Sequence, residues 1–217
     1  MTQTDRDALL DAALIHVPFE GMNDAALRAG ARDIGMAADL VAVHFPRGGA
    51  DLAAAYHRRA DAALRDRLAT DPPQGRFRDR VSDSVWARLD LVDPELVRAG
   101  AATLAMPQNA GLAARLVWET ADAIWTGLGD NSDDVNWYSK RATLSAVISA
   151  TVLFWLGDES EGRADTREFL NRRIEGVMRF EGVKAKLSRL PGVSAVTRGA
   201  FGWVRAPRSH PLPGKTR

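Results

Sequence analysis

The segment GDNSDDVNWYSKRA, residues 129–142, gathers the side chains that are best suited to chemistry. Asp130 and Asp134 stand at positions 1 and 5 of a hypothetical calcium-binding loop, in which carboxylate oxygens coordinate the cation. Such a loop needs glycine at position 6 and a bidentate glutamate at position 12, but this sequence has Val135 and Arg141 there. The segment is therefore not predicted to bind a metal ion.

The acidic residues of this segment are explained by the start of a helix. Asn131 or Ser132 can cap the helix, and two aspartates then fall in its first turn, where the helix dipole favours negative charge. Trp137 and Tyr138 follow at adjacent positions, whose side chains point about 100° apart on a helix. One of these two aromatic residues is therefore expected near the surface.

No catalytic constellation is found elsewhere in the chain. The four histidines, His16, His44, His57 and His210, belong to no His-Glu-x-x-His or Glu-x-x-His pair, and His44 is read as a packing or capping residue. The sequence also has no phosphate-binding loop, no G-x-G-x-x-G and no G-x-S-x-G elbow. Cysteine is absent, which excludes disulfides and thiolate chemistry. We therefore expect a protein that is not an enzyme and has no cofactor or metal.

The composition, 46% hydrophobic and 26% charged, is typical of a soluble globular protein. The uncharged run at 142–157 is shorter than the roughly 20 residues of a membrane span. The first twenty residues carry four acids against one arginine, unlike a transit peptide. These features predict a cytoplasmic bacterial protein without a transit peptide, and the basic amphipathic segment at 183–190 adds peripheral association with the inner face of the membrane.

Hydrophobic spacing and helix-capping residues predict an all-α fold. Helices are expected at 5–17, 24–36, 37–45, 51–68, 77–89, 94–105, 107–126, 133–156 and 165–190. The DPPQG break at 71–75 divides an N-terminal three-helix module, residues 1–70, from a C-terminal helical domain, residues 75–190. Residues 191–217 are rich in glycine and proline and are predicted to form a basic, disordered tail.

The N-terminal module resembles the helix-turn-helix of TetR-type repressors over NDAALRAGARDIGMAADLVAVHFPRGGADLAAAY, residues 23–56. A recognition helix of that type must present polar and cationic groups to DNA. The corresponding helix here contains no lysine or arginine, and Asp39 would repel the phosphate backbone. We therefore expect a degenerate helix-turn-helix with no nucleic-acid partner. The alternative is a TetR-type transcriptional regulator that responds to a hydrophobic ligand.

Residues 104–147 together with TREFLNRRIEGVM are similar to the coenzyme Q protein nine family of ubiquinone-biosynthesis accessory proteins, and the similarity extends over about residues 5–190. Its most specific motif is G-D-x-S-x-D-x-N-W-Y-x-[KR]-R-A, which residues 129–142 match. Departures from the family are Asp133 for threonine, Val135 for phenylalanine and Ser139 for threonine.

This resemblance implies a TetR-like helical bundle that binds isoprenoid or phospholipid chains, presents a quinone intermediate to the demethoxyubiquinone hydroxylase and forms a homodimer through its C-terminal helices. It also implies that the hydroxylase docks on a patch carried over to Asp134, Asn136, Trp137 and Tyr138. Arg141 would then lie near a lipid head group.

The residues themselves add two expectations. Large apolar side chains on the C-terminal helices could line a lipid cavity, and they are Leu116, Trp118, Ile124, Trp125, Leu144, Ile148, Val152 and Trp155. The segment VKAKLSRL is a basic amphipathic piece suited to an anionic membrane surface, through Val183, Lys184, Lys186, Leu187, Arg189 and Leu190. Beyond Glu181 the chain has eight basic residues and no acid, which suits lipid or nucleic acid as an anionic partner, although a merely solubilising tail explains the charge equally well.

Overall fold

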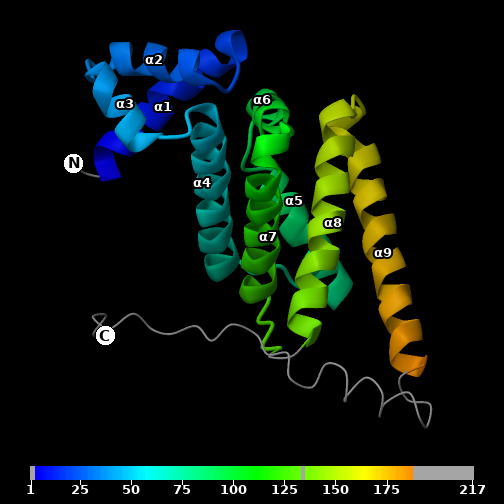
Figure 1. Cartoon of the computed structure of the whole chain (residues 1–217). Coiled ribbons are helices and arrows are strands. Elements are labelled where there is room, and N and C mark those ends of the chain that lie inside the picture. The colour runs from blue at the N-terminus through cyan, green and yellow to red at the C-terminus, as the bar shows by residue number, and fades with distance from the viewer. Residues whose placement is uncertain (1–2, 133–134, 188–217) are drawn as a thin grey trace, which may run out of the picture.

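The computed structural model describes residues 3–132 and 135–187, and every regular element within them is a helix (Figure 1). The all-α prediction is therefore confirmed for this part of the chain. The helices are α1 (Gln3–Glu20), α2 (Asp24–Asp33), α3 (Ala38–His44), α4 (Gly49–Thr70), α5 (Phe77–Leu89), α6 (Pro94–Leu104), α7 (Ala110–Gly127), α8 (Val135–Gly157) and α9 (Ala164–Leu187).

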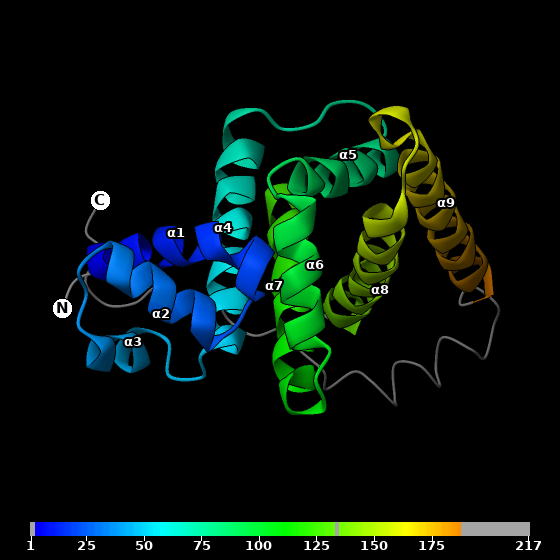
Figure 2. The same ribbon diagram turned by 90° about the horizontal axis from the view of Figure 1, so that it is seen from above.

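The N-terminal module consists of α1 to α3 packed on the first half of α4 (Figure 1). Helix α2 is capped by Asn23, whose Oδ1 accepts hydrogen bonds from the backbone nitrogens of Ala25, at 2.7 Å, and Ala26. The short helix α3 has no buried residue and exposes Val43. Seen from above, α1 and α2 lie over one end of the bundle, with α1 in contact with α6 (Figure 2).

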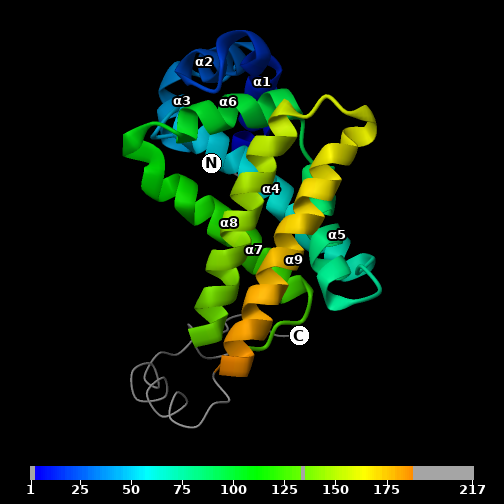
Figure 3. The ribbon, with the colours of Figure 1, turned by 90° about the vertical axis from the view of Figure 1, so that its right-hand side faces the viewer.

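The C-terminal bundle is built from the second half of α4 and from α5 to α9. Helices α8 and α9 run side by side along one face of the molecule (Figure 3). Helix α4 is shared, since Leu52 belongs to the core of the module and Leu64 to the core of the bundle. This shared helix joins the two cores rigidly, and the division into domains at residues 70–75 stays a prediction.

Several helix boundaries differ by up to three residues from those expected, and two of these differences involve prolines. Helix α1 continues through Pro18 to Glu20, although the proline has no N–H to donate to the carbonyl four residues earlier. Residues Pro107–Asn109 form a separate 3₁₀ turn, and α7 begins only at Ala110. Within the described residues, no helix is long and apolar enough to cross a membrane.

The close packing of α1 on α2 depends on Gly30, where an added Cβ would lie 2.5 Å from the backbone nitrogen of Ala13. We predict that Gly30→Ala lowers the free energy of unfolding by about 1–3 kcal/mol, because backbone atoms cannot move away easily. The matched control is Gly176→Ala on exposed helix α9, where the same Cβ meets nothing within 4 Å. The control is expected to raise stability by up to about 1 kcal/mol. Urea denaturation followed by circular dichroism measures both, and equal midpoints would contradict the packing argument.

Candidate functional site

An apolar cavity of about 320 Å³ lies inside the bundle, between α4, α5, α6, α7 and α8. Its volume falls at the lower end of the range for small-molecule sites in proteins. Most of its lining is alanine, valine, leucine and isoleucine, with polar groups confined to a few residues of α4, α5, α7 and α8. We call it the main cavity, and it could enclose part of an apolar ligand.

Four of the apolar residues expected at a lipid site line the main cavity: Leu116, Ile124, Ile148 and Val152. Two others line a second, smaller cavity of about 190 Å³ between α5, α7, α8 and α9, namely Trp125 and Leu144. Trp155 is buried near the end of α8, under the guanidinium of Arg163. The structure thus distributes these residues over three places, and their role in binding lipid stays a prediction.

One wall of the main cavity contains a buried polar cluster that we define as His57, Asp61, Arg88 and Thr120. Asp61 is fully buried on α4, and Arg88 of α5 donates to it from Nε at 2.6 Å. Thr120 of α7 donates its hydroxyl hydrogen to the same carboxylate, at 2.9 and 3.0 Å. A buried carboxylate is costly unless it is paired and hydrogen-bonded in this way. Asp61 therefore connects three helices at one point.

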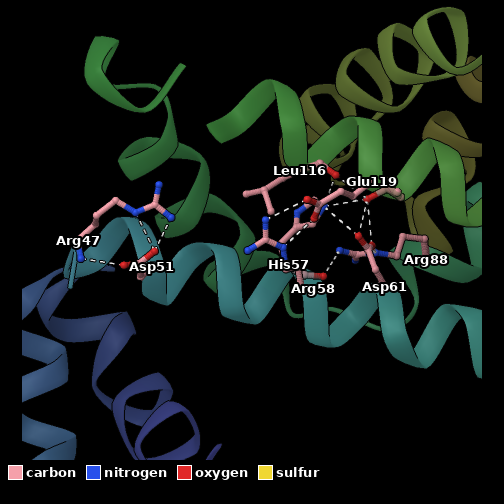
Figure 4. Close-up of polar contacts among 9 residues, drawn as sticks. Arg47, Asp51, His57, Arg58, Asp61, Arg88, Leu116 and Glu119 are labelled. Atoms are coloured by element: carbon pink, nitrogen blue, oxygen red, sulfur yellow. Dashed lines mark hydrogen bonds and ion pairs between the residues drawn. The ribbon is translucent and has the colours of Figure 1, made fainter. Parts of the chain in front are cut away.

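His57 lies one turn before Asp61 on α4, and its Nε2 is 2.8 Å from Thr120 Oγ1 and 3.1 Å from the carbonyl oxygen of Leu116. Figure 4 shows His57, Asp61 and Arg88 facing Leu116 and Glu119 of α7. Burial lowers the pKa of His57, against the opposing attraction of the Asp61 carboxylate. The imidazole is therefore neutral at neutral pH.

Sequence reasoning missed the polar cluster. His57 and Asp61 are four residues apart and lie on one face of a helix, a spacing that can be read from the sequence. Their partners Arg88 and Thr120 come from other helices, and nothing in the local sequence pairs them with α4. Only the helix packing brings the cluster together.

The segment after α7 is organised by Asp130. Helix α7 ends in a Schellman motif, in which Asp130 N donates to Trp125 O at 2.9 Å and Gly129 takes φ of +81°. The Asp130 side chain is 5% exposed and binds Lys140 Nζ at 2.7 Å and Arg141 Nη1 at 3.1 Å. Burial alone would raise the pKa of Asp130, but hydrogen bonds from Lys140, Ser132 and Arg141 outweigh it and hold the pKa below its usual range. The carboxylate is therefore an anchor between α7 and α8.

Arg141 is 2% exposed, and its guanidinium is held by two carboxylates and a carbonyl oxygen. It donates to Asp122 at 2.6 Å, to Asp130, and to the carbonyl oxygen of Trp137 at 3.2 Å. Its carbon Cζ also lies 3.9 Å from the centroid of the Trp137 ring. Arg141 is not among the residues that line the main cavity, so its geometry is that of an ion-paired support for Trp137.

Trp137 and Tyr138 form an aromatic cluster with Trp118 of α7. The Trp137 and Tyr138 rings meet edge to face at 4.8 Å, and Trp118 lies 5.9 Å from Trp137 and 6.4 Å from Tyr138. Tyr138 is 36% exposed, whereas Trp137 is half-buried against Arg141. Trp118, expected in the lipid cavity, instead lies beside the residues expected to dock a partner.

The remaining predicted site residues are less well covered by the structure. Asn136 is exposed on the first turn of α8, beside the aromatic cluster. Asp134, Arg189 and Leu190 lie outside the described residues. Val183, Lys184, Lys186 and Leu187 belong to the last turns of α9, and only their backbone is described. The membrane surface thus stays a prediction.

A larger groove of about 950 Å³ opens between the N-terminal module and α6. Its rim carries Asp24, Arg28, Arg47 and Gln108, and the groove is open to solvent along its length. An apolar ligand gains most where water is excluded. The main cavity, although smaller, is therefore the better candidate site.

The fold defines a class of protein. Two solved structures share it: a TetR transcriptional regulator from Nitrosomonas europaea (TM-score 0.57, 21% identity, 80% of this chain and 97% of that one) and a tetR-family regulator from Streptomyces coelicolor (TM-score 0.56, 20% identity, 91% and 96%). At such identities the likeness concerns the fold alone. The expected TetR-like architecture is therefore confirmed.

Sequence comparison identifies the family within that class. The COQ9 family model matches residues 110–181, which include α7, the Asp130 anchor and most of α9. The chain is 32% identical to the ubiquinone biosynthesis protein coq9, mitochondrial, of Schizosaccharomyces pombe, over 77% of this chain and 67% of that protein. It is also 32% identical to the COQ9 protein of Drosophila melanogaster and 28% identical to that of Homo sapiens. The chain belongs to the COQ9 family.

The comparisons correct the expected location. The relatives are named mitochondrial proteins of eukaryotes, which contradicts the prediction of a cytoplasmic bacterial protein without a transit peptide. The chain spans 61% of the fly protein and 63% of the human one. The inference relied on the charge of the first twenty residues, and the names of the relatives overturn it.

The Asp130 anchor leads to a prediction about stability and pH. We expect Asp130→Asn to lower the free energy of unfolding at pH 7 by about 2 kcal/mol, because two charge-assisted hydrogen bonds are lost. Since the folded-state pKa of Asp130 is depressed, its stabilisation is present above the unfolded value near 4 and disappears as the pH falls through the folded value. The difference between wild type and variant should therefore shrink towards about pH 3.

Chemical denaturation at several pH values measures this difference. The control is Glu168→Gln, which removes an exposed partner of Arg172 and should change stability little at any pH. A deficit of Asp130→Asn that stays constant down to pH 3 would contradict the ionised anchor.

Proposed function

We propose that this chain acts in ubiquinone biosynthesis as a non-enzymatic accessory protein, which binds an isoprenoid or phospholipid chain in the main cavity and presents a quinone intermediate to a hydroxylase. The observation that carries the proposal is an apolar cavity lined by five helices in a member of the COQ9 family. The names of the relatives supply the pathway. The described residues contain no group of three or more His, Asp or Glu side chains that could hold a metal ion.

The cavity and the aromatic cluster are placed in a way that suits presentation. Helix α7 carries Leu116 and Thr120 on the main cavity and Trp118 in the aromatic cluster. A partner that binds Tyr138 and Trp118 would therefore contact α7, the helix that also lines the ligand cavity. We propose this cluster, with Asn136, as the docking surface for the demethoxyubiquinone hydroxylase.

The rival function is that of a ligand-responsive transcriptional regulator. The two structural neighbours are named transcriptional regulators. Helix α3, at the position of a recognition helix, has the sequence ADLVAVH and offers no lysine or arginine. Asp39 and Val43 are exposed on it. Phosphate neutralisation dominates DNA affinity, so this surface favours the accessory function over DNA binding.

Filling the main cavity tests the proposed function directly. Ala101 lines the cavity on α6 and is half-buried, so Ala101→Phe places a ring in the space that a lipid chain would occupy. We expect this variant to lose co-purifying lipid and to bind an apolar fluorescent probe at least about tenfold more weakly. Mass spectrometry of extracted lipids and probe titration are the measurements.

The matched control is Ala102→Phe, which makes the same substitution at the next position of α6. Ala102 is exposed and faces the open groove instead of the main cavity. It should bind lipid and probe like the wild type. The proposed function is contradicted if Ala101→Phe retains the same lipid, or if the two variants lose it equally.

The docking surface is tested at Tyr138. Its exposed ring can be removed at little cost to the fold, whereas Trp137 stacks on buried Arg141 and its loss would disturb the Asp130 anchor. We expect Tyr138→Ala to weaken binding to the hydroxylase by at least about tenfold, as for aromatic residues at the centre of an interface. The lipid content should stay unchanged. Calorimetry with the purified hydroxylase measures the loss.

The control for docking is Phe19→Ala. Phe19 is 89% exposed on α1, and α1 lies at the opposite end of the molecule from the first turn of α8 (Figure 1), so its removal should leave hydroxylase affinity unchanged. If Tyr138→Ala binds as tightly as wild type, or no more weakly than Phe19→Ala, the partner docks elsewhere.

A further inference from the structure

The polar cluster in the wall of the main cavity holds more hydrogen-bonding capacity than the fold uses. Asp61 accepts hydrogen bonds from Arg88 and Thr120. His57 and Arg88, by contrast, both line the cavity. Burying polar groups beside an apolar space costs free energy, and a plain core would place leucine or valine here.

The tautomer of His57 follows from its partners. The carbonyl oxygen of Leu116 can only accept, and Thr120 already donates its single hydroxyl hydrogen to Asp61. Nε2 must therefore carry the imidazole hydrogen and donate it, at 2.8 Å to Thr120 Oγ1 and at 3.1 Å to Leu116 O. In the neutral ring, Nδ1 is then an acceptor with a free lone pair.

Two nitrogen atoms of the cluster have no hydrogen-bond partner within the described residues. Arg88 uses Nε for Asp61 and Nη2 for the carbonyl oxygen of His57, which leaves Nη1. His57 uses Nε2, which leaves Nδ1. Neither atom is enclosed by protein, since the only enclosed and unpartnered side-chain atoms of the described residues belong to His44 and Ser145. The cluster thus offers one donor and one acceptor to a ligand.

The charge of the cluster selects among head groups. The positive charge of Arg88 is already balanced by Asp61 at 2.6 Å, and His57 is neutral. Glu119, which pairs with Arg58 at 2.7 Å, adds a further carboxylate beside His57. A phosphate would meet no uncompensated positive charge here, whereas an uncharged group that both donates and accepts hydrogen bonds would be satisfied.

We propose that the polar cluster recognises the uncharged, oxygen-bearing ring head of the bound molecule, a phenol or hydroquinone, with His57 Nδ1 accepting from a ring hydroxyl and Arg88 Nη1 donating to a second ring oxygen. This rests on the proposed function, because it assumes that the main cavity holds an amphipathic ligand. The apolar chain then lies against α6, along Leu96, Gly100 and Leu104. The cavity is accordingly selective for ring-headed lipids over phospholipids.

The test compares three probes that share a ten-carbon chain: decylhydroquinone, decylbenzene and decyl phosphate. Affinities are measured under reducing conditions by competition with a fluorescent apolar probe. Wild-type protein should bind decylhydroquinone at least about tenfold more tightly than decylbenzene, as one well-placed pair of hydrogen bonds allows. Decyl phosphate should bind more weakly than decylhydroquinone.

His57→Gln is the decisive variant. The glutamine amide can still donate to Thr120 and Leu116 from the position of Nε2, but it has no acceptor at the position of Nδ1. The His57→Gln protein should bind decylhydroquinone no more tightly than decylbenzene, and its affinity for decylbenzene should equal that of the wild type. His57→Phe keeps an aromatic ring but removes both nitrogens, so it should lose the preference as well. It replaces His57→Gln in the test if circular dichroism shows that His57→Gln is unfolded. His16→Gln, at a histidine paired with exposed Asp33 on the module, is the control and should behave as wild type.

The outcomes separate this inference from the proposed function. If the wild-type protein binds decylbenzene and decylhydroquinone equally, or if decyl phosphate binds best, the cavity holds lipid but the polar cluster does not recognise a ring head group. The same conclusion follows if a folded His57 variant keeps the preference. If no probe binds wild-type protein, the lipid-binding function fails and this inference falls with it.

Discussion

The buried carboxylate of Asp61 is the contact on which the site depends. It lies on α4, is fully buried, and takes hydrogen bonds from Arg88 of α5 and Thr120 of α7. These three helices are walls of the main cavity, so one anion fixes the spacing of the walls around a space that apolar packing would otherwise tend to close. A buried ion pair is weak evidence for stability, because well-packed apolar residues often stabilise more. Its presence here is better explained by the shape and chemistry of the cavity than by the needs of the fold.

Helix α7 belongs both to the wall of the main cavity and to the aromatic cluster. One of its faces carries Leu116 and Thr120 on the cavity, and another carries Trp118 in the aromatic cluster with Trp137 and Tyr138. At the end of α7, the Schellman turn places Asp130 within hydrogen-bonding distance of Lys140 and Arg141. These ion pairs hold the start of α8 against α7. A ligand in the cavity and a partner on the cluster would therefore contact one rigid element. That arrangement gives a physical route by which the two binding events could favour each other.

The fold was more predictable from sequence than the site. Helical spacing is a local signal, and α2 and α6 begin at Asp24 and Pro94, where these helices were expected to begin. The polar cluster was not predicted, because Arg88 and Thr120 reach Asp61 only through the packing of three helices. Trp118 was assigned to the cavity because it is large and apolar, yet the direction of its side chain depends on how α7 is rotated, which one sequence does not reveal. Arg141 was expected near a lipid head, and its burial between Asp122 and Asp130 likewise depends on the tertiary structure.

The TetR-like scaffold thus contains an apolar cavity, and the short helix α3 offers no lysine or arginine to DNA. The most direct test of the central claim is to locate the bound chain. Photo-crosslinking with a hydroquinone whose alkyl tail ends in a diazirine, followed by peptide mapping, reports which helix the tail touches. The account predicts labelling of α6 and of the cavity face of α7, at residues such as Leu104 and Val117. Labelling confined to the open groove, or to the aromatic cluster around Trp118, would contradict it.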